Sequence, residues 1–291
     1  MSSRMTLAIP FLNQLQDAKS PLATFRHNTS DETEWLIIDN GSTDPIEEFI
    51  LKFIKPKRMN YVRNESNVGL VKSYQQAYEN CETDFLAITH NDVFVFEKDW
   101  DKRVVKLFEE MPDLGGVGFF GSAGCGPVGE RIQDVKYSGQ MAGLSNMLEA
   151  EVHGMRLDKE WEYVSIFDGF MMIFRMEMLK KVGGFDQRYK YHHIYDRDAS
   201  LESLRQGYKN IVVNVPCHHL SGLTANRSDY QDWIKKLQGR EDGDMFTHDE
   251  NSKIFREKFD SVLPLYVESD GTFRTGTQGQ WNFKGDAIKK L

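Results

Sequence analysis

Residues 35–44 read WLIIDNGSTD, a short apolar run that ends in an aspartate and an Asn-Gly turn. An apolar run of this length, followed by turn residues, is typical of a β-strand that ends at a loop. Residues 45–54 (PIEEFILKFI) then place apolar side chains at helical spacing. Pro45 suits a first helical turn, where its missing N–H costs little. The stretch therefore predicts a strand, a polar turn and a helix, in that order.

The same alternation extends on both sides of this stretch. Runs typical of strands lie at residues 5–10, 59–63 and 85–89, and residues 15–27 and 68–80 lie between them with the length of helices. Strands that alternate with helices predict βαβ crossovers, and so a mostly parallel sheet with helices on both faces. We therefore expect an α/β fold of the Rossmann-like kind.

Beyond residue 95 the pattern is less regular. Strands are expected at 117–120, 164–174 and 211–215, and helices at 100–111, 175–182 and 196–206, while residues 121–165 follow no clear period. Helical patterns at 229–237 and 250–259 come after a boundary placed near 222–227. We expect one domain over residues 1–224, with halves that meet near residue 95, and a C-terminal helical extension over 225–291 packed on it.

The composition is that of a water-soluble globular protein. Of 291 residues, 40% are apolar and 27% are charged, which excludes collagen-like, disordered and disulfide-scaffold classes. The formal net charge of −8 disfavours nucleic acid as a partner but leaves room for a local basic patch.

No apolar run reaches the roughly 18 residues of a membrane span. The N-terminus is too polar for a secretory signal, and three scattered cysteines indicate free thiols in a reducing compartment, which we take to be the cytoplasm.

Polar residues follow each of the first four predicted strands. They are Asn13, the turn 39–44, the segment 63–69 (RNESNVG) and the segment 90–92 (HND). In a parallel α/β sheet the ligand crevice lies beyond the carboxyl ends of the strands. Four strand ends that deliver polar groups to one edge therefore predict the binding site there.

The HND segment places two metal-binding side chains, His90 and Asp92, on the same side of an extended turn. Divalent cations such as Mg²⁺ or Mn²⁺ prefer oxygen ligands and often bridge the phosphates of a nucleotide. The alternative is a histidine that caps a helix or packs in the core, beside an aspartate that serves only the turn.

His218 and His219 follow a later strand. Because consecutive side chains diverge on an extended chain, at most one of them is expected to be a ligand while the other makes a packing or acceptor contact. From the pair alone, a structural histidine that binds no metal is the favoured alternative.

Two further acidic segments offer binding or catalytic groups. Asp39, at a strand end, can accept hydrogen bonds from a base or a ribose, or it can simply stabilise the Asn-Gly turn. Asp196 and Asp198 lie at the start of a predicted helix, where the helix dipole stabilises ionised carboxylates. One of them can act as a general base in a cleft, and one can cap the helix.

Seven ordered segments over residues 5–222 resemble the family 2 glycosyltransferases, which have the GT-A fold. They are 8–13 (AIPFLN), 37–44 (IIDNGSTD), 67–70 (NVGL), 85–93 (FLAITHNDV), 167–186 (from FDGFMM to VGGFD), 195–209 (YDRDASLESLRQGYK) and 215–222 (VPCHHLSG). The resemblance implies a metal-dependent, inverting transfer of a sugar from a nucleoside diphosphate, with UDP as the expected nucleotide and Mn²⁺ or Mg²⁺ as the cofactor. The acceptor would be a hydroxyl of a saccharide or of another molecule. Residues 1–95 would then be the nucleotide-binding half and residues 96–224 the acceptor half.

The resemblance also implies roles for individual residues. Asp39 would read the nucleobase. The family's metal-binding D-x-D motif falls on residues 90–92, where His90 replaces the first carboxylate, and its catalytic Glu-Asp pair falls on Tyr195 and Asp196, so the glutamate is absent. Asp196 is then the first candidate for the base and Asp198 the second. The metal ligands would be Asp92, His90 and one or both of His219 and His218. Nucleotide contacts are expected from Pro10, Asn13, Asp39, Asn67, Gly69, Asn91 and Asp92, and acceptor contacts from Asp168, Gly169 and Trp161.

The two departures from the family motifs support an alternative. With His90 and Tyr195 in place of acidic residues, the chain could be a nucleotide-sugar or glycan binding module with weak or no catalysis. A zinc hydrolase is disfavoured, because no two histidines have the i, i+4 spacing of helical zinc ligands.

Overall fold

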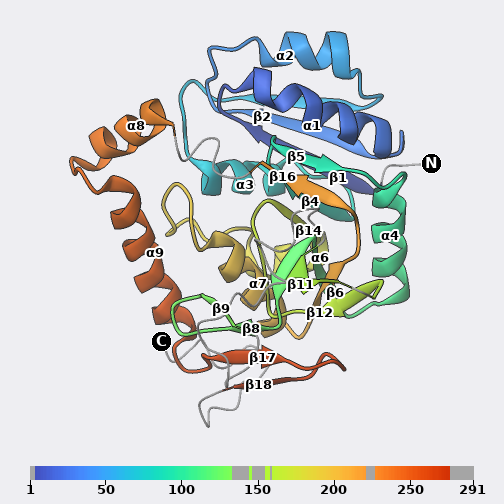
Figure 1. The fold of residues 1–291 in the computed structure, drawn as a ribbon, viewed down its shortest axis with the longest axis vertical. Coiled ribbons are helices and arrows are strands. Elements are labelled where there is room, and N and C mark those ends of the chain that lie inside the picture. The colour runs from blue at the N-terminus through green and yellow to red at the C-terminus, as the bar shows by residue number, and fades with distance from the viewer. Residues whose placement is uncertain (1–3, 133–143, 146–154, 158, 221–226, 276–291) are drawn as a thin grey trace.

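The computed structural model describes residues 4–132, 144–145, 155–157, 159–220 and 227–275. Its centre is an eight-stranded sheet in the order β12-β15-β6-β14-β4-β1-β2-β3. Strands β3, β2, β1, β4, β6 and β15 run in one direction, whereas β14 and β12 run in the other. The predicted mostly parallel α/β sheet is therefore confirmed (Figure 1).

The first half follows the predicted alternation of strands and helices. Its elements are β1 (Met5–Phe11), α1 (Leu15–Asn28), β2 (Glu34–Asp39), α2 (Ile46–Phe49), the π-helical turn η1 (Ile50–Ile54), β3 (Met59–Arg63), α3 (Leu70–Glu79), β4 (Phe85–Thr89), β5 (Val93–Val95) and α4 (Trp100–Glu110). Alternate strand residues pack on opposite faces of the sheet. Leu7 and Ile9 of β1 join the core beneath α1 and α4, whereas Ala8 joins the core beneath α3.

The second half contains many short strands. Its elements are β6 (Leu114–Gly118), β7 (Phe120–Ser122), β8 (Gly124–Cys125), β9 (Arg131–Ile132), β10 (Leu144–Ser145), β11 (Met155–Arg156), β12 (Trp161–Tyr163), β13 (Ile166–Phe167), β14 (Met171–Arg175), α6 (Met176–Val182), α7 (Tyr195–Arg205), β15 (Lys209–Val213) and β16 (Cys217–His219). Short strands thus occupy the described parts of 121–165, where no period was visible, and the rest of that segment lies outside the described residues.

The prediction of a single strand over residues 164–174 is wrong, because this segment forms two strands, β13 and β14. The chain leaves β13, which pairs with β7, and enters β14, which pairs with β4 and β6. The change of sheet occurs at Asp168 and Gly169. A side chain at Gly169 would bring a Cβ within 2.3 Å of the Tyr195 hydroxyl, so the bend depends on glycine at that position.

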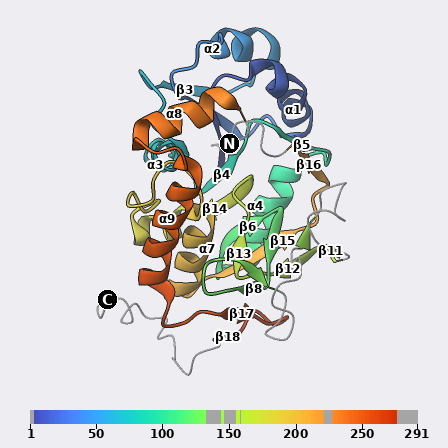
Figure 2. The same ribbon diagram turned by 60° about the vertical axis from the view of Figure 1, so that its left-hand side comes forward.

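The C-terminal part contains α8 (Ser228–Gln238), α9 (Gly243–Phe259), β17 (Leu265–Val267) and β18 (Phe273–Thr275). The expected extension is therefore not only helical, because β17 and β18 extend a small sheet with β8 and β9. Figures 1 and 2 show α9 beside the sheet domain and the two strands beneath it. Phe255 and Phe259 of α9 belong to the core beneath α3 and α7. Most of the boundary expected near 222–227 lies outside the described residues.

Candidate active site

The carboxyl end of β4 carries His90, Asn91 and Asp92, as expected from the sequence. Because β14 runs antiparallel to β4, the start of β14 lies against this end of β4. The His90 backbone N–H donates to the carbonyl oxygen of Phe170 at 2.9 Å. Asp168 and Gly169 are thereby brought beside the HND segment, although they lie far from it in the sequence.

A short two-stranded sheet brings a histidine to the same place. Strand β16 pairs antiparallel with β5, so that His219 lies opposite Val93 and His218 lies opposite Phe94. Successive side chains point to opposite faces of a strand. His219 therefore faces Asp92 and stacks on Phe170 with ring centroids 4.8 Å apart, whereas the His218 ring packs against Phe94.

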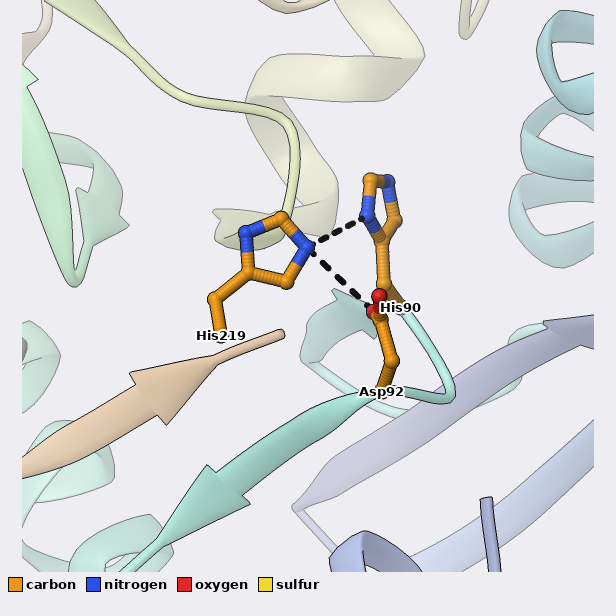
Figure 3. Close-up of side chains that lie close together, drawn as sticks. All are labelled: His90, Asp92 and His219. Carbon is orange, nitrogen blue, oxygen red and sulfur yellow. Dashed lines mark hydrogen bonds and ion pairs between the residues drawn. The ribbon is translucent and has the colours of Figure 1, made fainter. Parts of the chain in front are cut away.

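His90, Asp92 and His219 form a compact cluster (Figure 3). The Nε2 atom of His219 lies 3.4 Å from Nδ1 of His90 and 3.3 Å from Oδ1 of Asp92. One ligand atom from each residue lies within 4.8 Å of the others. This set of two imidazoles and one carboxylate could hold a divalent transition-metal ion, and the structure does not bring His218 into it.

The protonation states of the cluster suit a cation. Burial lowers the pKa of His90, and His219 lowers it further, so His90 is neutral and has a free lone pair for a metal. Burial raises the pKa of Asp92, but the contact and the charge of His219 outweigh it and leave the pKa below its usual value. Within the described residues, Asp92 Oδ1 is buried and has the ion-pair contact with His219 but no hydrogen bond of good geometry. Buried polar atoms without such partners are costly, and a cation bound beside Asp92 Oδ1 would offset this cost.

The cluster lines a cavity of about 320 Å³. Asp92 is only 6% exposed and Asp196 only 7%, yet both contribute to its wall. Of the residues predicted to bind nucleotide, metal or acceptor, or to act in catalysis, the cavity brings together ten. They are Pro10, Asn67, Gly69, His90, Asn91, Asp92, Asp168, Gly169, Asp196 and His219.

Asp196 is held at the first turn of α7 by two backbone groups. Its Oδ2 accepts a hydrogen bond from the N–H of Gly169 at 3.1 Å, and its Oδ1 accepts one from the N–H of Arg197 at 2.9 Å. The carboxylate has lone pairs to spare after these bonds. These two bonds fix the orientation of the Asp196 carboxylate at the cavity wall.

Asp198 has different surroundings. Its carboxylate is buried outside the residues that line the cavity, where it accepts a hydrogen bond from the Tyr189 hydroxyl at 2.8 Å and pairs with Lys258 of α9. Burial raises the pKa of Asp198 to about 6, against the opposing effect of Lys258. Its place in this buried network favours a stabilising role.

Asp39 and Asn13 build the loop beneath the site rather than its wall. The Asp39 carboxylate is fully buried, pairs with Arg63, and accepts hydrogen bonds from the Tyr61 hydroxyl at 2.6 Å and the Ser42 N–H at 2.7 Å. The Asn13 side-chain oxygen accepts a hydrogen bond from the Thr43 N–H at 2.7 Å. The base-reading role of Asp39 stays a prediction. Neither residue lines the cavity.

Trp161 also lies apart from the cavity. It belongs to β12 at the edge of the main sheet, where its ring contacts Tyr163 edge-to-face. An acceptor contact through Trp161 would require an acceptor that extends well beyond the cavity, and so it stays a prediction.

Eleven of the cavity residues were not predicted as site residues, and five of them have charged, imidazole or phenol side chains that were not singled out from the sequence. They are Arg131, His192, His193, Arg197 and Tyr230. Arg131 pairs with Asp168, and this pairing lowers the pKa of Asp168 although burial raises it. Arg197 could have been suspected from its place inside the YDRD segment. Arg131 comes from a segment without periodicity, and Tyr230 comes from the C-terminal extension, so no local pattern marked either residue.

Comparisons with known proteins give the family and the fold of the chain. Residues 6–183 match the model of glycosyl transferase family 2, and there is no match among curated proteins. Solved structures of similar fold include a mannosyltransferase from Pyrobaculum calidifontis in complex with GDP-Man and Mn²⁺ (18% identity, TM-score 0.56, 88% of this chain). GalNAc-T7 with UDP, GalNAc and Mn²⁺ (12%, 0.58, 80%) and S. aureus TarS 1-349 with UDP-GlcNAc (14%, 0.52, 81%) are also similar.

This chain spans 65%, 48% and 65% of the lengths of those three structures. At these identities the likeness establishes the fold, which is GT-A. The family match covers more than half of the chain and includes the cavity residues from Pro10 to Gly169, whereas Asp196 and His219 lie beyond it. The chain therefore belongs to glycosyl transferase family 2.

Proposed function

We propose that the protein transfers a sugar from a nucleoside diphosphate sugar, with UDP as the first nucleotide to test, to a hydroxyl of a saccharide or related acceptor, with inversion at the anomeric carbon. The observation that supports this most directly is that Asp92 and Asp196 line one cavity from different elements. A donor held beside Asp92 would then meet an acceptor oxygen beside Asp196.

His90, Asp92 and His219 are the residues that would hold a divalent cation. Two imidazoles beside one carboxylate favour Mn²⁺ over Mg²⁺, since Mg²⁺ prefers oxygen ligands only. When bound, the cation would neutralise charge on the departing diphosphate. The proteins in complex with Mn²⁺ among the similar structures agree with this assignment.

Asp196 would act as the general base. The acceptor oxygen forms a bond to the anomeric carbon while the bond from that carbon to the diphosphate oxygen breaks, and the acceptor proton passes to Asp196. The two backbone N–H groups that bind Asp196 keep its carboxylate oriented. A displacement in one step needs no covalent intermediate and inverts the configuration.

The remaining residues divide between the two substrates. Pro10, Asn67, Gly69 and Asn91 would contact the nucleotide, with Asn13 and Asp39 supporting that wall, whereas Asp168 and Gly169 would contact the acceptor. We assign residues 1–224 to the catalytic unit and 225–291 to an extension packed on it, which Phe255 and Phe259 support by their place in the shared core.

We place the protein in the cytoplasm, because its three cysteines are free and buried, as expected for a reducing compartment. In the described part of the chain, no helix is both long and apolar enough to cross a bilayer.

The function can be tested by release of free nucleotide. The purified protein is incubated with UDP-sugars, and then with GDP-sugars, in the presence of Mn²⁺, and free UDP or GDP is measured over time. Slow release without acceptor, lost in Asp92→Asn and Asp196→Asn variants that still fold, would support an enzyme. Binding of the nucleotide sugar with no release under any condition would support the alternative, a binding module.

A further inference from the structure

A second group of metal-binding side chains lies at the cavity, separate from His90, Asp92 and His219. The Nε2 atoms of His192 and His193 lie 2.5 and 3.0 Å from the same oxygen, Oδ1 of Asp244. Ligand atoms from these three residues lie within 4.8 Å of one another. Both histidines line the cavity, and Asp244 comes from the first turn of α9.

Two consecutive histidines usually point in different directions, so their convergence needs a cause. The backbone is left-handed at Tyr191, His193 and Ile194, with φ of 54°, 71° and 69°. This turn places the ring centroids of His192 and His193 4.0 Å apart. Residues other than glycine rarely adopt the left-handed conformation, because it brings Cβ close to the following carbonyl oxygen. Strained backbone of this kind persists only where the surroundings impose it, and it clusters at functional sites.

Asn251 of α9 imposes the conformation. Its side-chain Oδ1 accepts the N–H of Lys190 at 2.9 Å, and its Nδ2 donates to the carbonyl oxygens of Lys190 and His192 at 3.0 and 2.7 Å. One helix thus supplies both the residue that shapes the loop and the carboxylate that faces its two histidines. The cluster is held in place by the fold from two sides.

We propose that His192, His193 and Asp244 form a second divalent-cation site, of the class that Zn²⁺ and Co²⁺ occupy. Two imidazole nitrogens and one carboxylate oxygen are a common ligand set for zinc. The outer partner of a metal-bound histidine is also present, because the Tyr230 hydroxyl lies 2.6 Å from Nδ1 of His192. The hydroxyl oxygen can accept a hydrogen bond from Nδ1–H, and in that tautomer Nε2 is free for the metal.

A cation here would join α9 to the loop that leads into Tyr195 and Asp196. It would stabilise the left-handed turn and hold the α8–α9 extension at the cavity. Its role is therefore structural, and its binding does not depend on whether sugar transfer occurs. If no cation binds, the same atoms form a hydrogen-bonded cluster in which both histidines donate to Asp244.

The experiment counts bound cations without measuring activity. The metal-free full chain is titrated with Co²⁺ and with Zn²⁺, and stoichiometry is followed by calorimetry and by the visible absorption of Co²⁺. We expect two cations per chain for the wild type, one for Asp92→Asn, one for Asp244→Asn, and none for the double variant. Tyr230→Phe keeps all three ligands and should weaken the second site by about 10–100-fold.

Circular dichroism and thermal unfolding establish that each variant folds. If Asp244→Asn does not fold, His193→Gln replaces it, because it removes a different ligand of the same site. His193→Gln combined with Asp92→Asn should then bind no cation, like the first double variant. A single cation in the wild type that is lost in Asp92→Asn would overturn the proposal. So would a second cation that survives both Asp244→Asn and His193→Gln.

Discussion

Nε2 of His219 lies 3.3 Å from Oδ1 of Asp92, and the pairing of β16 with β5 is what brings these atoms together. The same pairing turns His218 to the opposite face, against Phe94. Of these two neighbouring histidines, His219 therefore lines the cavity and His218 does not. This difference provides a matched pair of variants.

His219→Ala should weaken Mn²⁺ binding and lower turnover by at least about 100-fold, since a first ligand matters more than an outer partner, whose loss costs about 10–100-fold. His218→Ala should change both by less than about threefold, because its ring contacts only Phe94 among the aromatic side chains described. Activity is measured against Mn²⁺ concentration for both variants. Equal losses in the two variants would show that the cluster does not hold the metal.

Asp196→Asn should lower turnover by about 10²–10⁴-fold, the usual contribution of general base catalysis. The Gly169 and Arg197 N–H groups bind different oxygens of Asp196, so asparagine keeps only one of these two hydrogen bonds. Donor binding should still change little, because Asp196 is assigned to the acceptor side. The dissociation constant for the nucleotide sugar and the rate of transfer are measured separately. A loss confined to donor binding would contradict the assigned role.

Asp198→Asn is the companion variant, since both aspartates were candidates for the base. Asp198 is buried against Tyr189 and Lys258, so we expect it to affect stability more than turnover. If Asp198→Asn abolished transfer in a protein that remained folded, while Asp196→Asn did not, the two roles would have to be exchanged.

Much of the fold was predictable, because the period of apolar residues reports local structure. Strands β1 to β4 and helices α1 to α3 were all anticipated, and the polar residues at their ends marked the correct edge of the sheet. The choice between His218 and His219 needed the register of β16 on β5, which arises from contacts distant in sequence. The break at Gly169 was equally hidden, since it depends on the approach of Tyr195.

The histidine pair 192–193 shows a different limit of prediction from the sequence. The rule that consecutive side chains diverge applies to extended chain, and the left-handed turn at Tyr191, His193 and Ile194 reverses it. None of these three residues is a glycine or an asparagine, so no local signal predicted a positive φ. The turn exists because Asn251, about sixty residues later in the chain, binds the backbone of the loop.

Asp39→Asn tests whether this residue reads the nucleobase or supports the loop. Its carboxylate accepts hydrogen bonds from Tyr61 and Ser42 and pairs with Arg63. We expect a loss of stability of about 1–3 kcal/mol from the weakened buried hydrogen bonds. Nucleotide binding should also weaken if the base stacks or bonds near this loop. Unfolding in urea gives the first quantity and calorimetric titration with UDP gives the second. Unchanged UDP affinity in a folded variant would remove Asp39 from the nucleotide site.

Asp198 predicts a pH dependence of stability. Its pKa in the folded protein is about 6, above the ordinary value of 3.8, mainly because of burial. A raised carboxyl pKa favours the folded state at low pH, fully below about pH 4, and this contribution is lost as the pH rises through about 6. Relative to Asp198→Asn, the wild type should lose about 2 kcal/mol of unfolding free energy between pH 4 and pH 7. A constant difference between the two proteins across this range would show that the proton is not held at Asp198.

Lys258 of α9 is the cation at the centre of this network. Its Nζ lies 2.9 Å from Glu202 and 3.1 Å from Asp186, and it also pairs with Asp198. Burial lowers the pKa of Lys258, but Asp198 and Glu202 more than offset this effect, so the side chain is charged. Lys258→Met would leave three carboxylates without their shared cation and should cost about 3–5 kcal/mol at neutral pH.

The deficit of Lys258→Met should shrink as the pH falls toward 5, because protonation of Asp198 removes one of the unpaired charges. Lys253→Met is the matched control on the same helix. Lys253 is 68% exposed and pairs only with Glu250 among the described residues, so its loss should cost less than about 0.5 kcal/mol. Both variants are compared by urea unfolding at pH 5 and pH 7. If Lys258→Met were no less stable than Lys253→Met at pH 7, the ion pairs of Lys258 would contribute nothing to the stability of the fold.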